Sequence, residues 1–433
     1  MRIYDIIDKK RHAKELSKEE IEFVISSYMK DEIKDYQISA LLMAICINSM
    51  SEAETSYLTN AILNSGDVLD LSSLNGYTVD KHSTGGIGDK TTLIVAPIVA
   101  SLGCTVAKMS GRGLGFTGGT VDKLESIEGF KTELSPADFL SQAKDIGIVV
   151  VGQSADLAPA DKKLYALRDV TATIDSIPLI ASSIMSKKLA SGSKSIVLDV
   201  KVGSGAFMKT VDDAEKLANA MVKLGKGFDR NVTAVLTNMN APLGLAVGNS
   251  VELWEAMEVL SGRGEQNLKA LCLTVSSCMV SSALSLELDV ARDMVENAIS
   301  TGKALAKFYE WIEYQGGNTS KIRDSSALLG AKYKKSILAE REGYISSLDA
   351  QAVGTASMML GAGRIKKEDK IDHSAGIILN KRVGDFVTKS EPIAMMYTSN
   401  EALFDSASNL FLGGVSYSNK MPTQNPLIYK IIK

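Results

Sequence analysis

One stretch of the chain reads Tyr77-Thr-Val-Asp-Lys-His-Ser-Thr-Gly-Gly-Ile-Gly-Asp-Lys-Thr-Thr92 and points to an α/β fold. It begins with a β-prone run, passes through glycines, and leads into the apolar segment Ile94–Leu102, which predicts a helix. Open α/β sheets bind ligands where a strand ends and a helix begins. Glycines let backbone N–H groups turn toward an anion, and side-chain donors are available from Lys81, Ser83 and Thr92. We therefore predict a phosphate loop over Lys81–Thr92, with a glycine-rich turn carrying solvated lysines as the simpler alternative.

A second glycine-rich segment reads Lys108-Met-Ser-Gly-Arg-Gly-Leu-Gly-Phe-Thr-Gly-Gly-Thr-Val-Asp-Lys123. It follows the extended run Thr105–Met109 and precedes a helix expected near Thr120, so we predict a second anion loop over Ser110–Lys123. Neither segment fits a nucleotide-binding fingerprint well, although Gly113-x-Gly115-x-x-Gly118 formally matches the dinucleotide pattern. The first lacks the Gly-Lys-Ser/Thr adjacency of a Walker A loop, and the second has no acid ending a second strand about 20 residues further on.

A third group of polar residues lies in the mostly helical segment Asp161–Lys188. Ser183 and Lys187 are spaced i, i+4 and therefore share one face of a helix that is otherwise largely apolar. A lone Arg168 or Lys187 is more often a solvated side chain, but an apolar helix favours a Ser/Lys pair that faces a cleft. His82 lies inside the first glycine loop and fits a structural or a catalytic role equally well.

The remaining pattern predicts three parts. The first 65 residues are typical of helices, with capping boxes at Ser17/Glu20 and Ser51/Glu54 and a buried helix over Asp35–Asn48. Apolar strands separated by helices indicate a parallel sheet, and they are expected at Ile146–Gly152, Ile196–Val202 and Thr233–Thr237. Segment 161–188 interrupts this alternation and is interpreted as a return to the helical domain, with hinges near Pro159 and 190–194.

The last 90 or so residues are broken by glycines and predict a small β-rich module in which 384–387 forms a hairpin strand. A biotinyl-type carrier is the alternative, although Met395-Met396 lacks the lysine that a carrier needs at its turn. The fold class is thus α/β, with a small all-α domain (1–65 and 161–190), a larger mixed α/β domain with a central sheet (77–158 and 195–340), and a C-terminal α+β module (341–433) packed against the α/β domain.

Composition limits the kinds of partner. A chain of 433 residues is long enough for two or three domains, and its net charge of −3 argues against an extended nucleic-acid or membrane surface. The four cysteines form no C-x-x-C pair and lie far from the three histidines, so a disulfide framework and a zinc site are both disfavoured. The charged N-terminus lacks a signal-peptide core, and no run of about 18 uncharged apolar residues is found. We expect a cytoplasmic protein with small-molecule ligands.

Five segments together resemble the thymidine phosphorylase and pyrimidine-nucleoside phosphorylase family: 81–89, 110–126, 157–162, 168–173 and 199–208. The resemblance runs over essentially the whole chain. It implies a homodimer whose active site lies in the cleft between an α domain and an α/β domain. The implied reaction is the reversible phosphorolysis of uridine, thymidine or deoxyuridine by inorganic phosphate, yielding free base and (deoxy)ribose 1-phosphate in nucleoside salvage. No organic cofactor is implied.

The resemblance also implies roles for individual residues. Phosphate would be bound by Lys81, Ser83, Thr92, Lys108, Met109, Ser110 and Thr120, and the pyrimidine by His82, Arg168, Ser183 and Lys187. His82, Arg168 and Lys187 would be catalytic, because the leaving base gains negative charge that cations and donors stabilise in the transition state.

Three further expectations come from the resemblance. Lys108 matches family members that accept both uridine and thymidine, since it could donate to a ribose 2′-hydroxyl. A potassium-type cation site would be formed, mostly through backbone oxygens, by Gly88, Lys90, Leu243, Ala246 and Glu255. Position 90 is lysine where related sequences often have threonine, and its positive charge would compete with the cation for the same site. Phe116 replaces a frequent histidine and could alter activity.

Three alternatives stay open. One is a thymidine-restricted phosphorylase. Another is a phosphoribosyltransferase of the anthranilate type, whose loop reads Gly-Thr-Gly-Gly-Asp where this chain has Ser83-Thr-Gly-Gly-Ile-Gly-Asp89. The third is a nucleotide-binding protein without catalytic activity.

Overall fold

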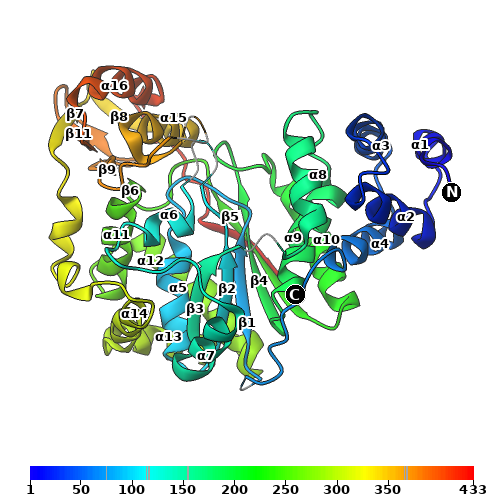
Figure 1. Cartoon of the computed structure of the whole chain (residues 1–433). Coiled ribbons are helices and arrows are strands. Elements are labelled where there is room, and N and C mark those ends of the chain that lie inside the picture. The colour runs from blue at the N-terminus through cyan, green and yellow to red at the C-terminus, as the bar shows by residue number, and fades with distance from the viewer. Residues whose placement is uncertain (75, 114, 116–117, 154–155, 365, 367–368) are drawn as a thin grey trace.

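The structure is a computed structural model that describes residues 1–433 except 75, 114, 116–117, 154–155, 365 and 367–368. Phe116, singled out from the sequence, lies outside the described residues. The chain forms a helical unit, an α/β body and a strand-rich C-terminal module, and Figure 1 shows the module and the helical unit on different sides of the α/β body. This arrangement confirms the predicted fold class.

The helical unit starts with four helices: α1 (Ile3–Arg11), α2 (Lys18–Met29), α3 (Asp35–Asn48) and α4 (Glu52–Leu63). Both predicted capping boxes are present, because the hydroxyls of Ser17 and Ser51 accept the backbone N–H three residues on. A buried ion pair joins α1 to α4, with Lys10 Nζ 2.8 Å from Glu54 Oε1. Apolar side chains from α1–α4 share one core with Leu164 and Leu179.

Those two leucines belong to α8 (Pro159–Asp169) and α9 (Ile177–Ala190), which return to the helical unit after the chain has entered the α/β body. Helix α9 packs on α4 and also on α10 (Val211–Gly227) of the α/β body. Ala181, Ile184 and Met185 of α9 are buried in a core that includes α10 and β4. The helix therefore lies between the two units.

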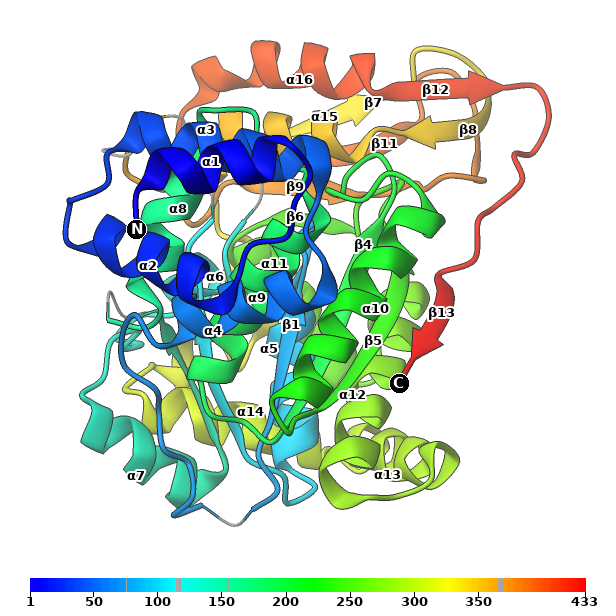
Figure 2. The ribbon, with the colours of Figure 1, turned by 90° about the vertical axis from the view of Figure 1, so that its right-hand side faces the viewer.

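The central sheet has the order β1-β4-β5-β13. Strands β1 (Val79–Ser83), β4 (Ser195–Val202) and β5 (Asn231–Asn238) are parallel, and a second parallel pair is formed by β2 (Val106–Ser110) and β3 (Ile148–Gly152). All of β4 is buried, as its apolar run predicted. The edge strand β13 (Ile428–Ile432) runs antiparallel to β5, beside it in Figure 2. The sequence interpretation placed this segment in the C-terminal module, and that placement was wrong.

Helices cover both sides of the strands. They are α5 (Thr91–Ala100), α6 (Thr120–Leu124), α7 (Pro136–Ile146), α10, α11 (Ser250–Leu260), α12 (Gln266–Leu284), α13 (Leu288–Ser300) and α14 (Lys303–Tyr314), with 3₁₀ turns at Thr319–Lys321 and Ser325–Leu329. Helix α12 is long and apolar enough to cross a membrane by length and composition. It packs against α5 and α13, however, and 56% of its apolar window is buried inside the protein, as in many core helices.

The C-terminal module contains two small sheets. One has the order β6-β9-β11-β7 and combines β6 (Ala246–Gly248) with β9 (Gly376–Leu379), β11 (Pro392–Thr398) and β7 (Tyr333–Leu338). The other joins β10 (Phe386–Val387), β8 (Gly343–Leu348) and β12 (Val415–Ser418). Helical segments complete the module: α15 (Ala350–Ser357), a π-helical turn (Met358–Ala362), a 3₁₀ turn (Glu401–Leu403) and α16 (Phe404–Gly413).

Two details of the module differ from expectation or clarify it. Strand β10 pairs with β8, which is distant in sequence, so the predicted hairpin at 384–387 was wrong. Met395 and Met396 lie inside β11, where Met396 is fully buried, so this dipeptide does not form the exposed turn of a carrier domain. Strand β6 comes from the α/β body and pairs with β9, which fixes the module to that body.

Candidate active site

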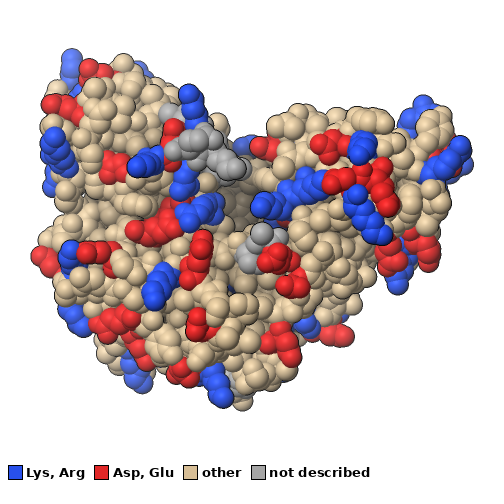
Figure 3. Space-filling model, viewed as in Figure 1, with Lys and Arg blue, Asp and Glu red and all other residues tan. Residues whose placement is uncertain are grey.

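The two glycine-rich loops meet Lys187 and Lys188 of α9 at the bottom of a hollow in the protein surface. Figure 3 shows this hollow between the module and the helical unit, with Lys and Arg side chains on both of its sides. At its base lies a cavity of about 290 Å³. Most of the residues predicted from the sequence line it: Lys81, His82, Ser83, Thr92, Lys108, Met109, Ser110, Thr120 and Lys187. An outer cavity of about 1000 Å³ shares Met109, Ser110 and Lys187 and continues along α8.

Lys81 is held at the cavity floor by acidic side chains. Its Nζ donates to Thr91 Oγ1 and lies 3.7 Å from Asp89 Oδ1 and 3.8 Å from Asp199 Oδ2. Burial of Asp89 opposes ionisation, but the charges of Lys81 and Lys201 outweigh it and hold the pKa of Asp89 well below its usual range. The carboxylates orient the Lys81 ammonium, so it can meet an anion without rearranging.

A second buried network joins three elements through Asp80. Lys188 Nζ lies 2.6 Å from Asp80 Oδ2, and Lys108 Nζ lies 3.2 Å from Asp80 Oδ1 and also donates to the Lys81 carbonyl. Burial would raise the pKa of Asp80, but both lysines together lower it to about 2. Burial lowers the pKa of Lys108 to about 8, with Asp80 opposing the shift and Lys188 and Lys81 adding to it.

His82 lies at the end of β1 among these cations. Burial lowers the pKa of its imidazole well below the usual value, and the nearby charges of Lys188, Lys108 and Lys187 lower it further. The imidazole is therefore neutral at neutral pH and can donate one hydrogen bond while accepting another.

Lys187 and Ser183 share one face of α9, as their spacing predicted. Lys187 Nζ lies 3.3 Å from Ser183 Oγ and 2.6 Å from Asp161 Oδ2 on the facing helix α8. Asp161 was not recognised from the sequence, because its pairing with Lys187 depends on how two helices pack. The ion pair holds the Lys187 ammonium at the wall shared by the inner and outer cavities.

Arg168 is not among the described residues that line either cavity. Its guanidinium donates to three backbone carbonyls, those of Thr173 (3.2 Å), Leu179 (3.2 Å) and Ile174 (2.8 Å). The side chain is buried, and burial lowers its pKa. The structure thus brings Lys187 to the two glycine-rich loops, whereas Ser183, like Arg168, is not among the described residues that line either cavity.

Lys123 and Asp122 fix the second loop to its surroundings. Lys123 Nζ donates to the carbonyls of Asp89 (3.0 Å) and Gly118 (3.2 Å), so it connects the two glycine-rich loops, and it lies 3.0 Å from Glu252 of α11. Asp122 accepts the Gly113 N–H at 2.5 Å and pairs with Arg364 of the C-terminal module at 3.1 Å. Glu252 and Arg364 come from distant parts of the chain, and no local pattern marked them.

The five residues expected to hold a potassium-type cation do come together, but around a side chain. Lys90 Nζ donates to the Leu243 carbonyl at 2.9 Å, to the Ala246 carbonyl at 2.7 Å and to Glu255 Oε2 at 2.6 Å. Gly88 borders the same oxygens, since a Cβ there would lie 2.6 Å from the Leu243 carbonyl oxygen.

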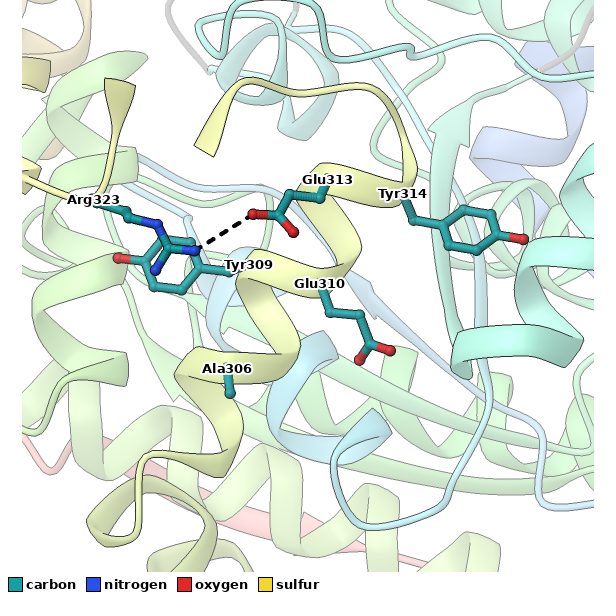
Figure 4. A pocket seen from close by; sticks show the side chains of 6 residues that line it. All are labelled: Ala306, Tyr309, Glu310, Glu313, Tyr314 and Arg323. Atoms are coloured by element: carbon teal, nitrogen blue, oxygen red, sulfur yellow. Dashed lines mark ion pairs between the residues drawn. The ribbon is translucent and has the colours of Figure 1, made fainter. Parts of the chain in front are cut away.

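A separate hollow of about 600 Å³ lies on α14, and Figure 4 shows its side chains. Arg323 lies across the ring of Tyr309 and pairs with Glu313 at 3.5 Å. None of the described residues that line this hollow belongs to the glycine loops or to α9. It contributes nothing to the cleft.

Three family models match the chain. One described as glycosyl transferase family, a/b domain, matches residues 75–305, and one described as glycosyl transferase family, helical bundle domain, matches residues 4–66. A third, described as pyrimidine nucleoside phosphorylase C-terminal domain, matches residues 344–418.

Curated relatives are similar over all or nearly all of their length. The chain is 52% identical over 434 residues, covering 100% of both chains, to a pyrimidine-nucleoside phosphorylase of Staphylococcus epidermidis (strain ATCC 12228 / FDA PCI 1200). It is 54% identical to that of Staphylococcus haemolyticus (strain JCSC1435) and 52% identical to that of Geobacillus stearothermophilus, with 95% of each chain covered in both comparisons.

Among solved structures, the chain is similar to anthranilate phosphoribosyltransferase from Thermus thermophilus. The TM-score is 0.58 at 16% sequence identity, with 71% of this chain and 98% of that chain covered. At this identity the similarity concerns the fold alone.

Proposed function

Because the chain belongs to the pyrimidine-nucleoside phosphorylase family, we propose that it catalyses the reversible phosphorolysis of pyrimidine nucleosides. Inorganic phosphate attacks C1′, the bond between C1′ and N1 of the base breaks, and the products are the free base and (deoxy)ribose 1-phosphate. We propose uridine, thymidine and deoxyuridine as substrates, and pentosyl transfer to phosphate in nucleoside salvage as the role of the reaction.

The single observation that carries the proposal is the inner cavity, where both phosphate loops face Lys187 of the helical unit. Lys81, Ser83, Thr92, Ser110 and Thr120 supply side-chain donors on one side, with Lys108 and Met109 beside them. A dianionic phosphate is favoured there by preorganised cations and by the backbone N–H groups of the glycine loops. The nucleoside would occupy the outer cavity, with its base toward α8 and α9.

Lys187, Arg168 and His82 are proposed to stabilise the departing base. As the C1′–N1 bond lengthens, negative charge moves onto the pyrimidine, and Lys187 faces the cavity in which it would lie. Arg168 uses three of its guanidinium N–H groups on backbone carbonyls, which leaves two of the five such groups for a base oxygen. Neutral His82 would donate a hydrogen bond to a base carbonyl, and Ser183 would orient the base through Lys187.

The test is phosphate-dependent release of uracil from uridine and of thymine from thymidine, measured side by side with purified protein. Comparable rates support broad specificity, and release from thymidine alone supports the restricted type. Magnesium-dependent consumption of phosphoribosyl pyrophosphate, without phosphorolysis, would overturn the proposal in favour of the transferase. Tight nucleoside binding without turnover would favour a binding protein.

We further propose that the chain is a cytoplasmic homodimer that uses phosphate as co-substrate and no organic cofactor, on the strength of its family resemblance. Light scattering on the eluted protein measures the assembly directly. The expected potassium site is a separate question, because Lys90 already occupies the oxygen atoms concerned.

A further inference from the structure

The buried ammonium of Lys90 has the surroundings of a bound cation. Lys90 is the N-cap residue of α5, and its side chain is fully buried among Leu243, Ala246 and Glu255. An ammonium has three N–H donors, and each meets one oxygen here: two backbone carbonyls at 2.9 and 2.7 Å and a carboxylate at 2.6 Å. The donor set is thus fully used and the charge is paired.

The oxygens around Lys90 are fixed by bonds of their own. Glu255 accepts the Leu245 N–H at 2.7 Å through Oε1 and the Ala246 N–H at 2.9 Å through Oε2. The backbone N–H of Leu243 donates to the Ile87 carbonyl at 2.9 Å. Segment 243–246 therefore folds around Glu255 and presents its carbonyls to one point.

Glycine is required at two places on the wall of this oxygen cage, which we define as the Leu243 and Ala246 carbonyls and the Glu255 carboxylate. Gly88 has φ +73°, and a Cβ there would lie 2.6 Å from the Leu243 oxygen and 3.2 Å from the Ala246 oxygen. Gly244 has φ +71°, and a Cβ there would lie 2.6 Å from Glu255 Oε2. At both positions a side chain would collide with a cage oxygen, so the backbone can approach the cage only with glycine there.

A potassium ion does not fit the cage beside this lysine. An ion bound by the same oxygens would lie in direct contact with the Lys90 ammonium, and two unit charges at that separation repel strongly in a buried setting. The only carboxylate in the cage already neutralises one positive charge. The five residues therefore lie together as the family resemblance implies, but their oxygens and their one negative charge are already used by Lys90.

We propose that the Lys90 ammonium is a built-in replacement for a bound monovalent cation, so that phosphate binding by this chain does not depend on potassium. The ammonium anchors the end of the first phosphate loop, since Lys90 directly follows Asp89, which pairs with Lys81, and lies two residues before Thr92. It also ties that loop to β6 and hence to the C-terminal sheet. A test by the KM for phosphate rests on the proposed phosphorolysis, whereas a test by the thermal unfolding midpoint does not.

The first experiment uses the unaltered protein. The KM for phosphate and the thermal unfolding midpoint are measured in potassium, sodium and tetramethylammonium chloride at a constant ionic strength of about 0.1 M. We expect both quantities to be the same in all three salts. Saturable activation by potassium, or a rise of the midpoint specific to potassium, overturns the proposal. Absence of phosphorolysis in every salt refutes the proposed function, while the unfolding midpoints still test the cation.

The second experiment removes the Lys90 ammonium from the oxygen cage. Lys90→Thr removes the ammonium and leaves space and a hydroxyl, whereas Lys90→Met fills a similar volume without charge. In tetramethylammonium we expect the KM for phosphate to rise by at least about tenfold in both variants, because charge-assisted hydrogen bonds are lost. Potassium should restore Lys90→Thr, in KM and in unfolding midpoint, but not Lys90→Met. Lys216→Thr, on the exposed face of α10, is the matched control and should behave like the parent.

A Lys90→Thr protein with unchanged phosphate KM and no response to potassium overturns the proposal. If Lys90→Thr is unfolded in tetramethylammonium, its refolding is titrated with potassium chloride against tetramethylammonium chloride. Recovery specific to potassium supports the proposal. Equal recovery in both salts, or none in either, counts against it.

Discussion

Lys188 Nζ lies 2.6 Å from Asp80 Oδ2, and through this buried ion pair helix α9 of the helical unit is fastened to strand β1 of the central sheet. Lys188 itself lines the inner cavity, and the pair lies one residue from Lys187 on α9 and one residue from Lys81 on β1. The two halves of the site are therefore joined at their base.

Replacing Lys188 with methionine should destabilise the protein. Asp80 keeps Lys108 but loses its shorter ion pair, and removing one partner of a buried pair costs about 3 kcal/mol. The free energy of unfolding in urea measures the loss. Lys223→Met is the matched control, because Lys223 pairs with Glu52 on the exposed surface, where ion pairs contribute about 0–1 kcal/mol. Equal losses in the two variants would refute the structural role of Lys188.

Lys187→Ala should lower kcat by about 10²–10³-fold, because the proposed donor to the departing base is lost. Phosphate should still bind, since the proposed phosphate donors are on the two glycine-rich loops. Steady-state kinetics and calorimetric titration with phosphate separate the two effects. Lys144→Ala on the exposed surface of α7 should leave both unchanged. Retained turnover in Lys187→Ala would show that the base is stabilised by other groups.

The value of kcat/KM for phosphate should fall as pH rises above about 8. The pKa of Lys108 is lowered to about 8 by burial in the free protein, so its ammonium is lost there and the cavity becomes less attractive to an anion. A pH profile of kcat/KM measures this alkaline decrease, and the profile of Lys108→Met should lack it. A profile with the same decrease in Lys108→Met would assign it to another group.

At neutral pH the lowered pKa of Lys108 should cost stability and the lowered pKa of Asp80 should add to it, although both contributions increase with pH. Between pH 8 and 10.5 the unfolded chain binds more protons at Lys108 than the folded one, so the contribution of this group to stability increases with pH. The pKa of Asp80 is lowered from 3.8 to about 2, so its stabilising contribution is present above pH 3.8 and is lost as pH falls toward 2. Urea unfolding of parent and Lys108→Met across the alkaline range tests the first effect: the parent should gain stability relative to the variant as pH rises.

Gly119→Ala should raise the KM for phosphate. A Cβ at Gly119 would lie 2.1 Å from the Gly113 nitrogen and 2.4 Å from the Arg112 carbonyl carbon, so the second loop must open to admit it. Gly111→Ala in the same loop is the control, because a Cβ there has no atom of the described residues within 4 Å. Phosphate kinetics of the two variants should differ clearly; an equal effect would mean that loop closure at Gly119 does not shape the site.

Local signals were sufficient for many elements. The capping boxes at Ser17 and Ser51 involve residues three apart, and the apolar run of β4 is long enough to identify a buried strand. The loops that line the inner cavity and the Ser183/Lys187 face of α9 were likewise visible in the sequence. In each case the signal that identifies the element lies within a few consecutive residues of the sequence.

Features fixed by distant partners could not be predicted. Asp161 reaches Lys187 from another helix, Lys188 is distinguished from Lys187 only by the side of α9 on which it lies, and Arg364 pairs with Asp122 across two units. Strand β10 was mistaken for part of a hairpin because its partner β8 is not its neighbour in sequence. No spacing rule relates such residues, since tertiary packing alone brings them together.

The position of β13 has a consequence for biosynthesis. Ile428–Ile432 pair with Ala234–Thr237 at the edge of the sheet that carries Lys81 and His82. A nascent chain that has already emerged through β5 exposes an unpaired strand edge until residue 432 leaves the ribosome, and such edges recruit other strands. Incomplete translation products of this protein are therefore expected to aggregate through β5, even though all the described residues that line the inner and outer cavities precede that strand.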